Sequence, residues 1–382
     1  MTTTKRLAHT LTTMLFALAT HANGTVNVHD SLTALSHEQG TYVPTVPSAE
    51  TMNAIDSISQ EKQKKGILTR IFDGVTDFFM GCDTNYVTPQ QYQFTTQTEL
   101  SYWHDYYHLR SSQTRNSMTI QSDPSLVLGG YLYYGFIGYG MSWNLNDIGK
   151  PKGLHNGTSR RQALSIHTAK FFAEIYSFNS GKTAKITYLT DYDLKDKDNS
   201  FSGLDSRCMG LQAFYIFNNK HFSWPAAYGE NAVQKRSCGT FNLGLSYNRQ
   251  KVTFNAAELP EHLQNVDPTL MFNKVDYSDY SVSIGYAYNW VLGKNLLFAF
   301  NLQPSLGYRH SNITEADLQH SVLDNVSTDL NMRASVFWNN TQYFTGIVLD
   351  LHTYSYRHDK FGLTNTYGTL KFVAGFNFLK KK

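Results

Sequence analysis

The chain has 382 residues and a formal net charge of +3, with 14% aromatic and 16% charged residues. Soluble proteins carry about 25% charged residues, yet the mean hydropathy here is −0.38 and no apolar run is long enough for a transmembrane helix. Apart from the terminal Lys380–Lys382, no basic cluster stands out, which argues against nucleic acid as a partner. Many aromatics with a low mean hydropathy are typical of a membrane β-barrel, in which lumen-facing and lipid-facing residues cancel.

Residues 1–22 predict a signal peptide. Lys5 and Arg6 give a basic start, residues 11–19 an apolar core, and Thr20-His21-Ala22 a cleavage site of small residues. The alternative is a short buried helix. Together with a barrel pattern, a signal peptide predicts the outer membrane of a Gram-negative cell, with the lipid bilayer as a partner.

Residues 23–90 are expected to form a periplasmic N-terminal segment. Residues 23–64 are polar and mixed, which predicts a flexible stretch. Within residues 65–80, apolar side chains recur at spacings of one, three and four, which predicts an amphipathic helix. This helix could plug the barrel, lie on the inner leaflet, or pack beneath the barrel with no function of its own.

Residues 91–382 predict an all-β fold, a closed antiparallel up-and-down transmembrane β-barrel of about 12 strands. The clearest signal is the stretch 280–308, in which apolar residues alternate with polar or small ones across a short turn at residues 292–294. The predicted strands are 91–109, 125–134, 137–146, 163–176, 182–193, 206–219, 237–254, 275–291, 295–312, 323–339, 342–356 and 364–379.

Connection lengths are asymmetric, as in outer-membrane barrels with short periplasmic turns and long external loops. Trp143 near an external strand end, and Trp290 and Trp338 near periplasmic ends, fit interfacial aromatic girdles. The short connections lie near 135, 179–181, 293–294 and 340, and the long ones at 110–124, 147–162, 194–205, 255–274 and 313–322.

One connection breaks this rule, because residues 218–236 should be a short periplasmic turn and are long. Long loops often carry function. The loop combines aromatic residues with a basic end, so we expect it either to plug the lumen or to bind a periplasmic protein. Its candidate binding residues are Phe222, Trp224, Tyr228, Lys235 and Arg236.

Several stretches resemble a Bacteroidetes family known as domain of unknown function 4421. They are residues 83–87 (Asp-Thr-Asn-Tyr-Val), 214–223 with 226–227, 234–240 (Gln-Lys-Arg-Ser-Cys-Gly-Thr), and 285–290 with 304–307. The resemblance covers most of residues 65–379. It implies an outer-membrane barrel and no particular activity.

Three cysteines, Cys82, Cys208 and Cys238, leave at least one thiol unpaired. A Cys208–Cys238 bridge looks possible in sequence. If residues 219 and 237 face each other, however, these two cysteines lie about ten strand residues apart, on the order of 30 Å. We expect them to be free, small, buried side chains.

Enzymatic and metal sites are weakly supported. His104 and His108 would lie about 13 Å apart on a strand and could not share a metal ion. A phospholipase-like site would need a serine and a histidine on one strand face, as in the pairs Ser165 with His167 and His221 with Ser223. No third catalytic group is identifiable, so neither an enzyme activity, a metal nor a cofactor is predicted.

The predicted lumen contains charges of both signs, which either fill the barrel with ion pairs or line a selective pore. A barrel of twelve strands can be either filled or open, so the strand number does not decide between these two interpretations. The leading hypothesis is a pore or transport-associated barrel for small polar solutes; the alternatives are a non-conducting structural or assembly partner of an envelope system, and an outer-membrane lipid hydrolase. The lumen candidates are Asn301, Gln303, Arg309, Asp329, Asn331, Arg333, Asp350, His352 and Lys371.

Overall fold

The structure is a computed structural model that describes residues 78–147, 160–179, 183–228, 232–264, 266–315, 320–357 and 361–381. Residues 78–80 are helical. The predicted signal peptide, most of the predicted N-terminal segment and residues 65–77 of the predicted helix lie outside the described residues.

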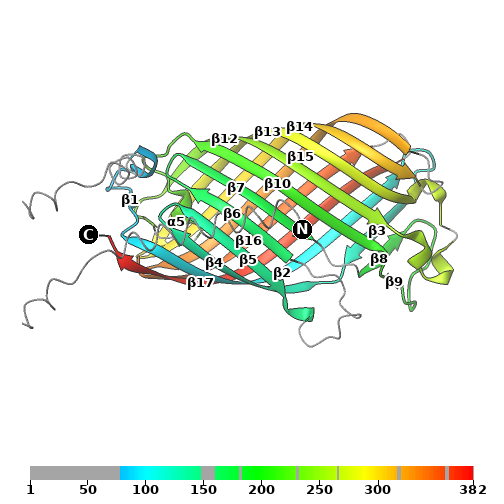
Figure 1. The fold of residues 1–382 in the computed structure, drawn as a ribbon, viewed down its shortest axis with the longest axis horizontal. Coiled ribbons are helices and arrows are strands. Elements are labelled where there is room, and N and C mark those ends of the chain that lie inside the picture. Colours follow the sequence, from blue (N-terminus) through cyan, green and yellow to red (C-terminus); the bar gives the residue numbers. More distant parts are fainter. Residues whose placement is uncertain are drawn as a thin grey trace, which may run out of the picture. The chain divides into compact units, whose positions relative to one another are not determined.

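Twelve antiparallel strands form a closed barrel (Figure 1). Each strand pairs with its neighbour along the chain, and the last strand pairs with the first over almost its whole length, from Phe361 opposite Ser111 to Lys380 opposite Tyr92. This confirms the predicted fold. The strands are β2 (Tyr92–Ser111), β4 (Ser125–Tyr134), β5 (Ile137–Asn144), β6 (Arg160–His167), β7 (Phe171–Asn179), β10 (Leu204–Ile216), β12 (Cys238–Phe254), β13 (Phe272–Gly293), β14 (Leu296–Glu315), β15 (His320–Asn339), β16 (Tyr343–Arg357) and β17 (Phe361–Lys380).

The two ends of the barrel carry different additional elements. At the left end of Figure 1 lie β1 (Val87–Thr88), α5 (Trp224–Ala227) and β11 (Val233–Gln234). The other end carries β3 (Ser117–Ser122), β8 (Ala184–Leu189), β9 (Ser200–Phe201) and the 3-10 turns η1 (Leu145–Asp147), η2 (Ala256–Glu258), η3 (Glu261–Leu263) and η4 (Pro268–Leu270). No helix in the described part of the chain has the length and apolar character to cross a membrane.

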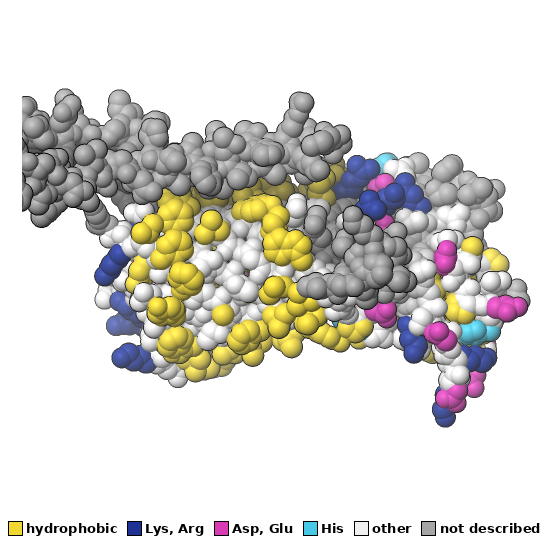
Figure 2. Space-filling model, turned by 60° about the horizontal axis from the view of Figure 1, so that its bottom comes forward, with side chains coloured by type: hydrophobic (Ala, Val, Ile, Leu, Met, Phe, Trp, Pro, Cys, Tyr) yellow, Lys and Arg dark blue, Asp and Glu magenta, His cyan; other side chains and the backbone are white. Residues whose placement is uncertain are grey.

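The alternation in β13 and β14 appears directly in their burial. Leu306 and Tyr308 are 60% and 51% exposed on the outer face, whereas Arg309, which follows Tyr308, is fully buried. Successive strand residues point to opposite faces, so a period of two assigns each residue either to lipid or to the lumen. Figure 2 shows the resulting apolar surface on the barrel wall, with charged side chains gathered at the two ends.

The predicted strand 163–176 is wrong, because it is two strands. Residues 168–170 form a tight turn, in which the Thr168 hydroxyl donates to the Phe171 carbonyl and accepts from the Phe171 amide. This turn contains no Gly, Pro, Asn or Asp, and the apolar pattern continues across it, so the sequence signal was lost.

The predicted strand 182–193 does not belong to the barrel wall either. Its residues include β8, which pairs with β3 and β9 beyond the end of the barrel. Because β7 runs antiparallel to β10 with Asn179 opposite Arg207, the connection after Asn179 lies at the end with long loops. The predicted short turn at 179–181 is therefore wrong, and the turn at 168–170 takes its place.

Short turns gather at one end of the barrel, where both Tyr92 and Lys380 also lie. In outer-membrane barrels the short turns face the periplasm, so we call this the periplasmic end and the other the external end. Trp290 and Trp338 near this end, and Trp143 near the external end, are 56%, 41% and 45% exposed on the outer face, as an interfacial girdle requires.

Candidate functional site: the closed lumen

Residues 218–228 and 232–236 of the long connection fold into the barrel from the periplasmic end, and we call this connection the plug. The Ser223 hydroxyl caps α5 by accepting from the Ala226 amide at 3.2 Å, and a proline follows at the second helical position. Trp224 is 2% exposed and its ring lies 4.6 Å from that of Phe214 and 5.6 Å from that of Phe172. The plug thus brings an aromatic core into the lumen.

Polar side chains of the barrel wall bind the backbone of the plug. Asn289 of β13 donates to the Ser223 carbonyl at 3.0 Å, and Asn339 of β15 donates to the Ala232 carbonyl at 3.1 Å. The Ser335 hydroxyl donates to the Ala227 carbonyl. These wall residues satisfy carbonyls that would otherwise be buried without partners, so the wall is built to hold this segment.

Gln234 organises the base of the plug. Its amide nitrogen donates to the carbonyls of His221 at 2.6 Å and Arg236 at 3.0 Å, and its amide oxygen accepts from the Ser223 amide and the Asn289 side chain, both at 3.0 Å. One side chain therefore links several parts of the plug and also links the plug to the barrel wall.

A second segment, residues 83–88, lies against the plug on the periplasmic side, and we call it the strap. β1 pairs with β11, and the Asp83 amide donates to the Lys220 carbonyl at 2.8 Å. The Tyr86 ring lies 4.3 Å from the His221 ring and 5.5 Å from the Arg236 guanidinium. The stretches that carry the family resemblance, 83–87, 214–223 and 234–240, therefore meet in one structure.

Two titratable groups, Asp83 of this segment and Cys82 just before it, have shifted pKa values. The Asn85 amide donates to the Asp83 carboxylate and lowers its pKa, with a contribution from nearby His221 and Arg236. Partial burial raises the pKa of the Cys82 thiol, and the negative charge of Asp83 adds to this. Cys82 is thus held as a neutral thiol rather than a reactive thiolate.

The five residues of the plug that were predicted to bind a partner divide into two groups. Phe222, Trp224 and Tyr228 are 1%, 2% and 8% exposed, so they pack inside the barrel and are not available to a partner; this part of the prediction is wrong. Lys235 and Arg236 lie at the periplasmic surface. The aromatic character of the loop arose from the packing of the plug.

Above the plug, a layer of buried ion pairs crosses the lumen. Asp350 of β16 accepts from Arg333 and lies 2.9 Å from the Lys371 ammonium. Glu174 of β7 pairs with Arg161 at 3.1 Å. Removing charges from water costs free energy that only close pairing offsets. These charged groups therefore pair with one another. Arg333 also lies over the ring of Tyr228, which joins this layer to the plug.

A second set of ion pairs surrounds Arg309, the largest fully buried side chain. Its guanidinium lies 2.8 Å from Asp279 and 3.3 Å from Asp329, and donates to the Ser355 carbonyl at 2.6 Å. The Ser327 hydroxyl donates to Asp279 at 2.7 Å. The predicted lumen residues are therefore inside the barrel, where they make a structural network.

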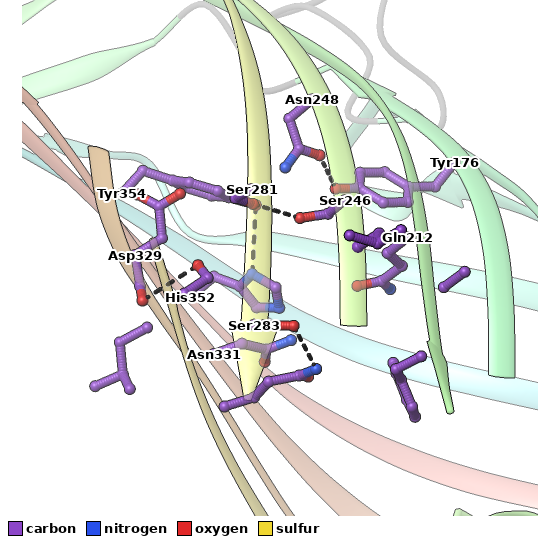
Figure 3. A pocket seen from close by; sticks show the side chains of 16 residues that line it. Tyr176, Gln212, Ser246, Asn248, Ser281, Ser283, Asp329, Asn331, His352 and Tyr354 are labelled. Atoms are coloured by element: carbon purple, nitrogen blue, oxygen red, sulfur yellow. Dashed lines mark hydrogen bonds between the residues drawn. The ribbon is translucent and has the colours of Figure 1, made fainter. Parts of the chain in front are cut away.

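Between these charges the lumen is polar, and the described residues line small cavities there. Asn301 accepts from Asn242 at 3.1 Å, Gln303 donates to Ser283 at 2.9 Å, and His352 stacks on Tyr367 with ring centroids 4.9 Å apart. Asn331 and His352 line the cavity in Figure 3 together with side chains from β7, β10, β12, β13 and β15. Three such cavities have volumes of about 40, 60 and 20 Å³, which suit a few water molecules and not a solute of several heavy atoms.

An apolar cluster lies at the external end, and we call it the cap. It joins strand ends such as Phe254 and Phe272 to residues of the external connections, including Ile186 and Leu263. The side chains of its members are at most a few per cent exposed. The complete set is Tyr107, Leu109, Met118, Ile120, Ala184, Ile186, Leu189, Phe201, Leu204, Val252, Phe254, Leu259, Leu263, Val266, Leu270, Phe272, Val275, Tyr277, Phe361 and Leu363.

The two serine–histidine pairs considered above lie in different surroundings. Ser223 caps α5, while the His221 ring lies against Tyr86 and 3.6 Å from Asp83. Ser165 and His167 both face the lumen, where His167 packs against the Phe172 ring at 4.8 Å. His104 and His108 contact Gln121 and Thr119 respectively, and the described residues include no group of His, Cys, Asp or Glu suited to a metal ion.

The three cysteines are free, as predicted, and Cys208 is buried, but Cys82 and Cys238 are only half-buried, so the predicted burial is wrong for these two. Cys208 lies opposite Gln250 in the pairing of β10 with β12, which confirms that Cys208 and Cys238 are far apart along the strands.

Several central residues escaped the sequence reasoning. Gln234 and Asn289 both lie in the quoted family stretches but carry no recognisable chemical motif. Asp279 occupies a lumen-facing position next to the outward Tyr280, so strand parity would have placed it inside. The sequence does not indicate the pairing of Arg161 with Glu174, because Arg161 falls in the predicted connection 147–162 and Glu174 in the predicted strand 163–176.

A closed antiparallel barrel with an outward apolar band and a polar interior defines an outer-membrane β-barrel protein. The sequence of residues 82–378 matches the family described as "Domain of unknown function (DUF4421)", and the chain belongs to this family.

Solved structures with similar folds are outer-membrane barrels. They include the outer membrane protease OmpT from Escherichia coli, with 6% identity, a TM-score of 0.36, and coverage of 75% of this chain and 96% of that one. An outer membrane channel from Pseudomonas putida F1 gives 11% identity, a TM-score of 0.30, and coverage of 77% and 98%. The P. putida toluene transporter TodX has 5% identity and a TM-score of 0.27, and the match covers 77% of this chain and 92% of that one. No curated protein matches the sequence.

Proposed function

We propose that this protein is a non-conducting outer-membrane barrel that serves as a structural or assembly partner in the cell envelope. The observation that carries the proposal is the double closure of the lumen, by the plug at the periplasmic end and by the cap at the external end. Paired charges occupy the space between them. A steady diffusion pore needs a continuous water-filled path, and the small cavities do not supply one.

The periplasmic end offers a surface for such a partnership, because it is basic. Among the described residues of this end, Asp83 is the only acidic one. Figure 2 shows Lys and Arg side chains at this end on the left of the view. The surface therefore fits a periplasmic protein with an acidic face. Its basic residues are Lys170, Lys220, Lys235, Arg236, Lys294, Lys380 and Lys381.

Single-channel current across a planar bilayer tests the closed lumen. We expect no conductance from the full chain, after folding has been verified by heat-modified gel mobility. The matched variant replaces residues 224–232 with a Gly-Ser linker of equal length. Steady current from the unaltered protein would contradict the proposal.

Crosslinking to periplasmic extract, followed by identification of the partner, tests the basic surface. Lys220→Glu with Lys294→Glu should abolish capture, because two positive charges at the docking face are reversed. Lys235 and Arg236 are left intact because they contact the strap. Lys185→Glu, at the external end, is the control and should capture the partner as the unaltered protein does.

A second candidate is a pore that opens when the plug withdraws. The supporting observation is that the described parts of the plug, residues 218–228 and 232–236, are held by hydrogen bonds and packing, and that the lumen above them is polar. This function predicts conductance from the linker variant and silence from the unaltered protein. Silence from both, with folded barrels, would favour the structural role alone.

A further inference from the structure

A group of charged side chains lies on the outer surface of the barrel, at the external border of the apolar band. It belongs to three neighbouring strands, β10, β12 and β13. These side chains point outward, because the residues between them in sequence, such as Gln250 and Val275, are buried in the interior. We call the group the border patch: Asp205, Arg207, Arg249, Lys251, Lys274 and Asp276.

The height of the border patch follows from the strands below it. On β12 the outward residues Phe241 and Leu245 are 60% and 66% exposed, Tyr247 follows, and Arg249 comes next. On β10 the outward Met209 immediately precedes Arg207 toward the external end. Tyrosines mark the interface of such barrels, and the Tyr247 and Tyr280 rings pack 5.0 Å apart there. The border patch thus lies at the level of the lipid headgroups.

The acidic residues of the border patch do not neutralise it. Arg207 lies 3.2 Å from Asp205, and Arg249 lies 3.3 Å from Asp276. Lys274 shares Asp276 at 3.7 Å. Within the described part of the chain, Lys251 makes no ion pair, so four cations face two carboxylates.

The strand register places two cations side by side. Arg207 lies directly opposite Lys251 in the pairing of β10 with β12, and Lys251 lies opposite Asp276 in the pairing of β12 with β13. Directly opposed side chains have Cβ atoms about 5 Å apart, and like charges in this arrangement destabilise a sheet. An anion that binds between them would remove the repulsion, and a headgroup phosphate is the anion available at this height.

We propose that the border patch binds a phosphorylated glycolipid of the outer leaflet. Arg207 and Lys251 hold a phosphate between them through charge-assisted hydrogen bonds. The two carboxylates are unsuited to a simple anionic phospholipid, but they can accept hydrogen bonds from sugar hydroxyls. The exposed tyrosines below provide a surface for the acyl chains. The mixture of charges therefore fits a headgroup that carries both phosphates and sugars.

Binding of purified lipopolysaccharide to the full chain, folded in detergent, tests this assignment by titration. The variant is Arg207→Gln with Lys251→Gln, and the control is Arg110→Gln, an exposed outward cation on β2 at the same end. We expect the control to bind as the unaltered protein does and the double variant to bind at least about tenfold more weakly. Dephosphorylated lipopolysaccharide should also bind at least about tenfold more weakly to the unaltered protein.

Stability without lipid provides a second readout. Because the opposed pair is repulsive, the double variant should unfold at the same temperature as the unaltered protein or at a higher one. If the double variant does not fold, Lys251→Gln alone carries the test, with the same expected direction. Equal affinity of the folded variant for lipopolysaccharide overturns the proposal. Equal binding of phosphatidylglycerol through the same residues overturns the assignment to a glycolipid.

Discussion

The plug at the periplasmic end and the cap at the external end close the same lumen by different means. The plug is a single segment whose backbone is held by directed hydrogen bonds from Asn289, Ser335 and Asn339. The cap gathers apolar side chains from several connections and strand ends, and no single segment forms it. Hydrogen bonds to one segment can be broken together when that segment moves. An apolar cluster, in contrast, loses stability in proportion to the apolar area that becomes exposed. We therefore expect any opening of this barrel to begin at the plug.

Removal of the central aromatic ring of the plug should have the largest effect. Trp224→Ala leaves a cavity among Phe172, Phe214 and Tyr228, and should cost about 3–5 kcal/mol. Hydrogen exchange of residues 218–236 should rise while that of the cap is unchanged. Trp290→Ala, which removes an outward ring at the same end, is the control. Equal exchange in both variants would mean that the plug does not depend on this ring.

Truncation in the cap should destabilise without opening the plug. Leu263→Ala removes a fully buried side chain from the cap and should cost about 2–4 kcal/mol in urea unfolding. Hydrogen exchange should increase around η3 and β8 and stay unchanged at residues 218–236. Increased exchange at both ends would show that plug and cap form one cooperative unit, contrary to the comparison above.

Loss of the Gln234 amide should loosen the base of the plug. Gln234→Leu keeps much of the volume but leaves the His221 and Arg236 carbonyls and the Ser223 amide without this partner. Unsatisfied buried groups cost about 1–3 kcal/mol. The expected readout is a lower unfolding temperature together with faster proteolysis near residue 228. Gln264→Leu, an exposed glutamine of the external end, should leave both measurements unchanged.

The smallest effect is expected at Asp267, which anchors η4 in the external connections. Burial opposes its ionisation, but hydrogen bonds from Thr114, Thr269 and Asn116 outweigh burial and lower the pKa of Asp267 to about 2. Because the folded pKa lies below the ordinary value near 3.9, the stabilisation is present above about pH 4 and is lost as the pH falls to about 2.

Asp267→Ala should therefore cost about 1 kcal/mol at pH 7, as loss of a capping side chain does, and less at pH 2. Unfolding temperatures at the two pH values measure the difference, with Glu261→Ala as the control. A cost that is the same at both pH values would show that the carboxylate charge of Asp267 does not contribute.

The sequence by itself determined the barrel, the side of the wall to which most strand residues belong, and the long hairpin of β13 and β14. The physical reason is local, because a period of two assigns each side chain to lipid or lumen wherever strands are long. It also placed Asn301, Gln303, Arg309 and Lys371 inside the barrel. It failed where the pattern continued through the turn at 168–170.

Only the tertiary structure decided what the interior does. Arg309 meets Asp279 and Asp329 from neighbouring strands, and Gln234 meets Asn289 across 55 residues of chain. The alternation of side chains along a strand predicts that such groups point inward. It does not predict which of them form hydrogen bonds or ion pairs with each other, because that pairing depends on barrel closure and register. For the same reason the aromatic residues of the 218–236 loop had the composition of a binding surface. Their burial became evident only when the loop was seen folded back between the walls.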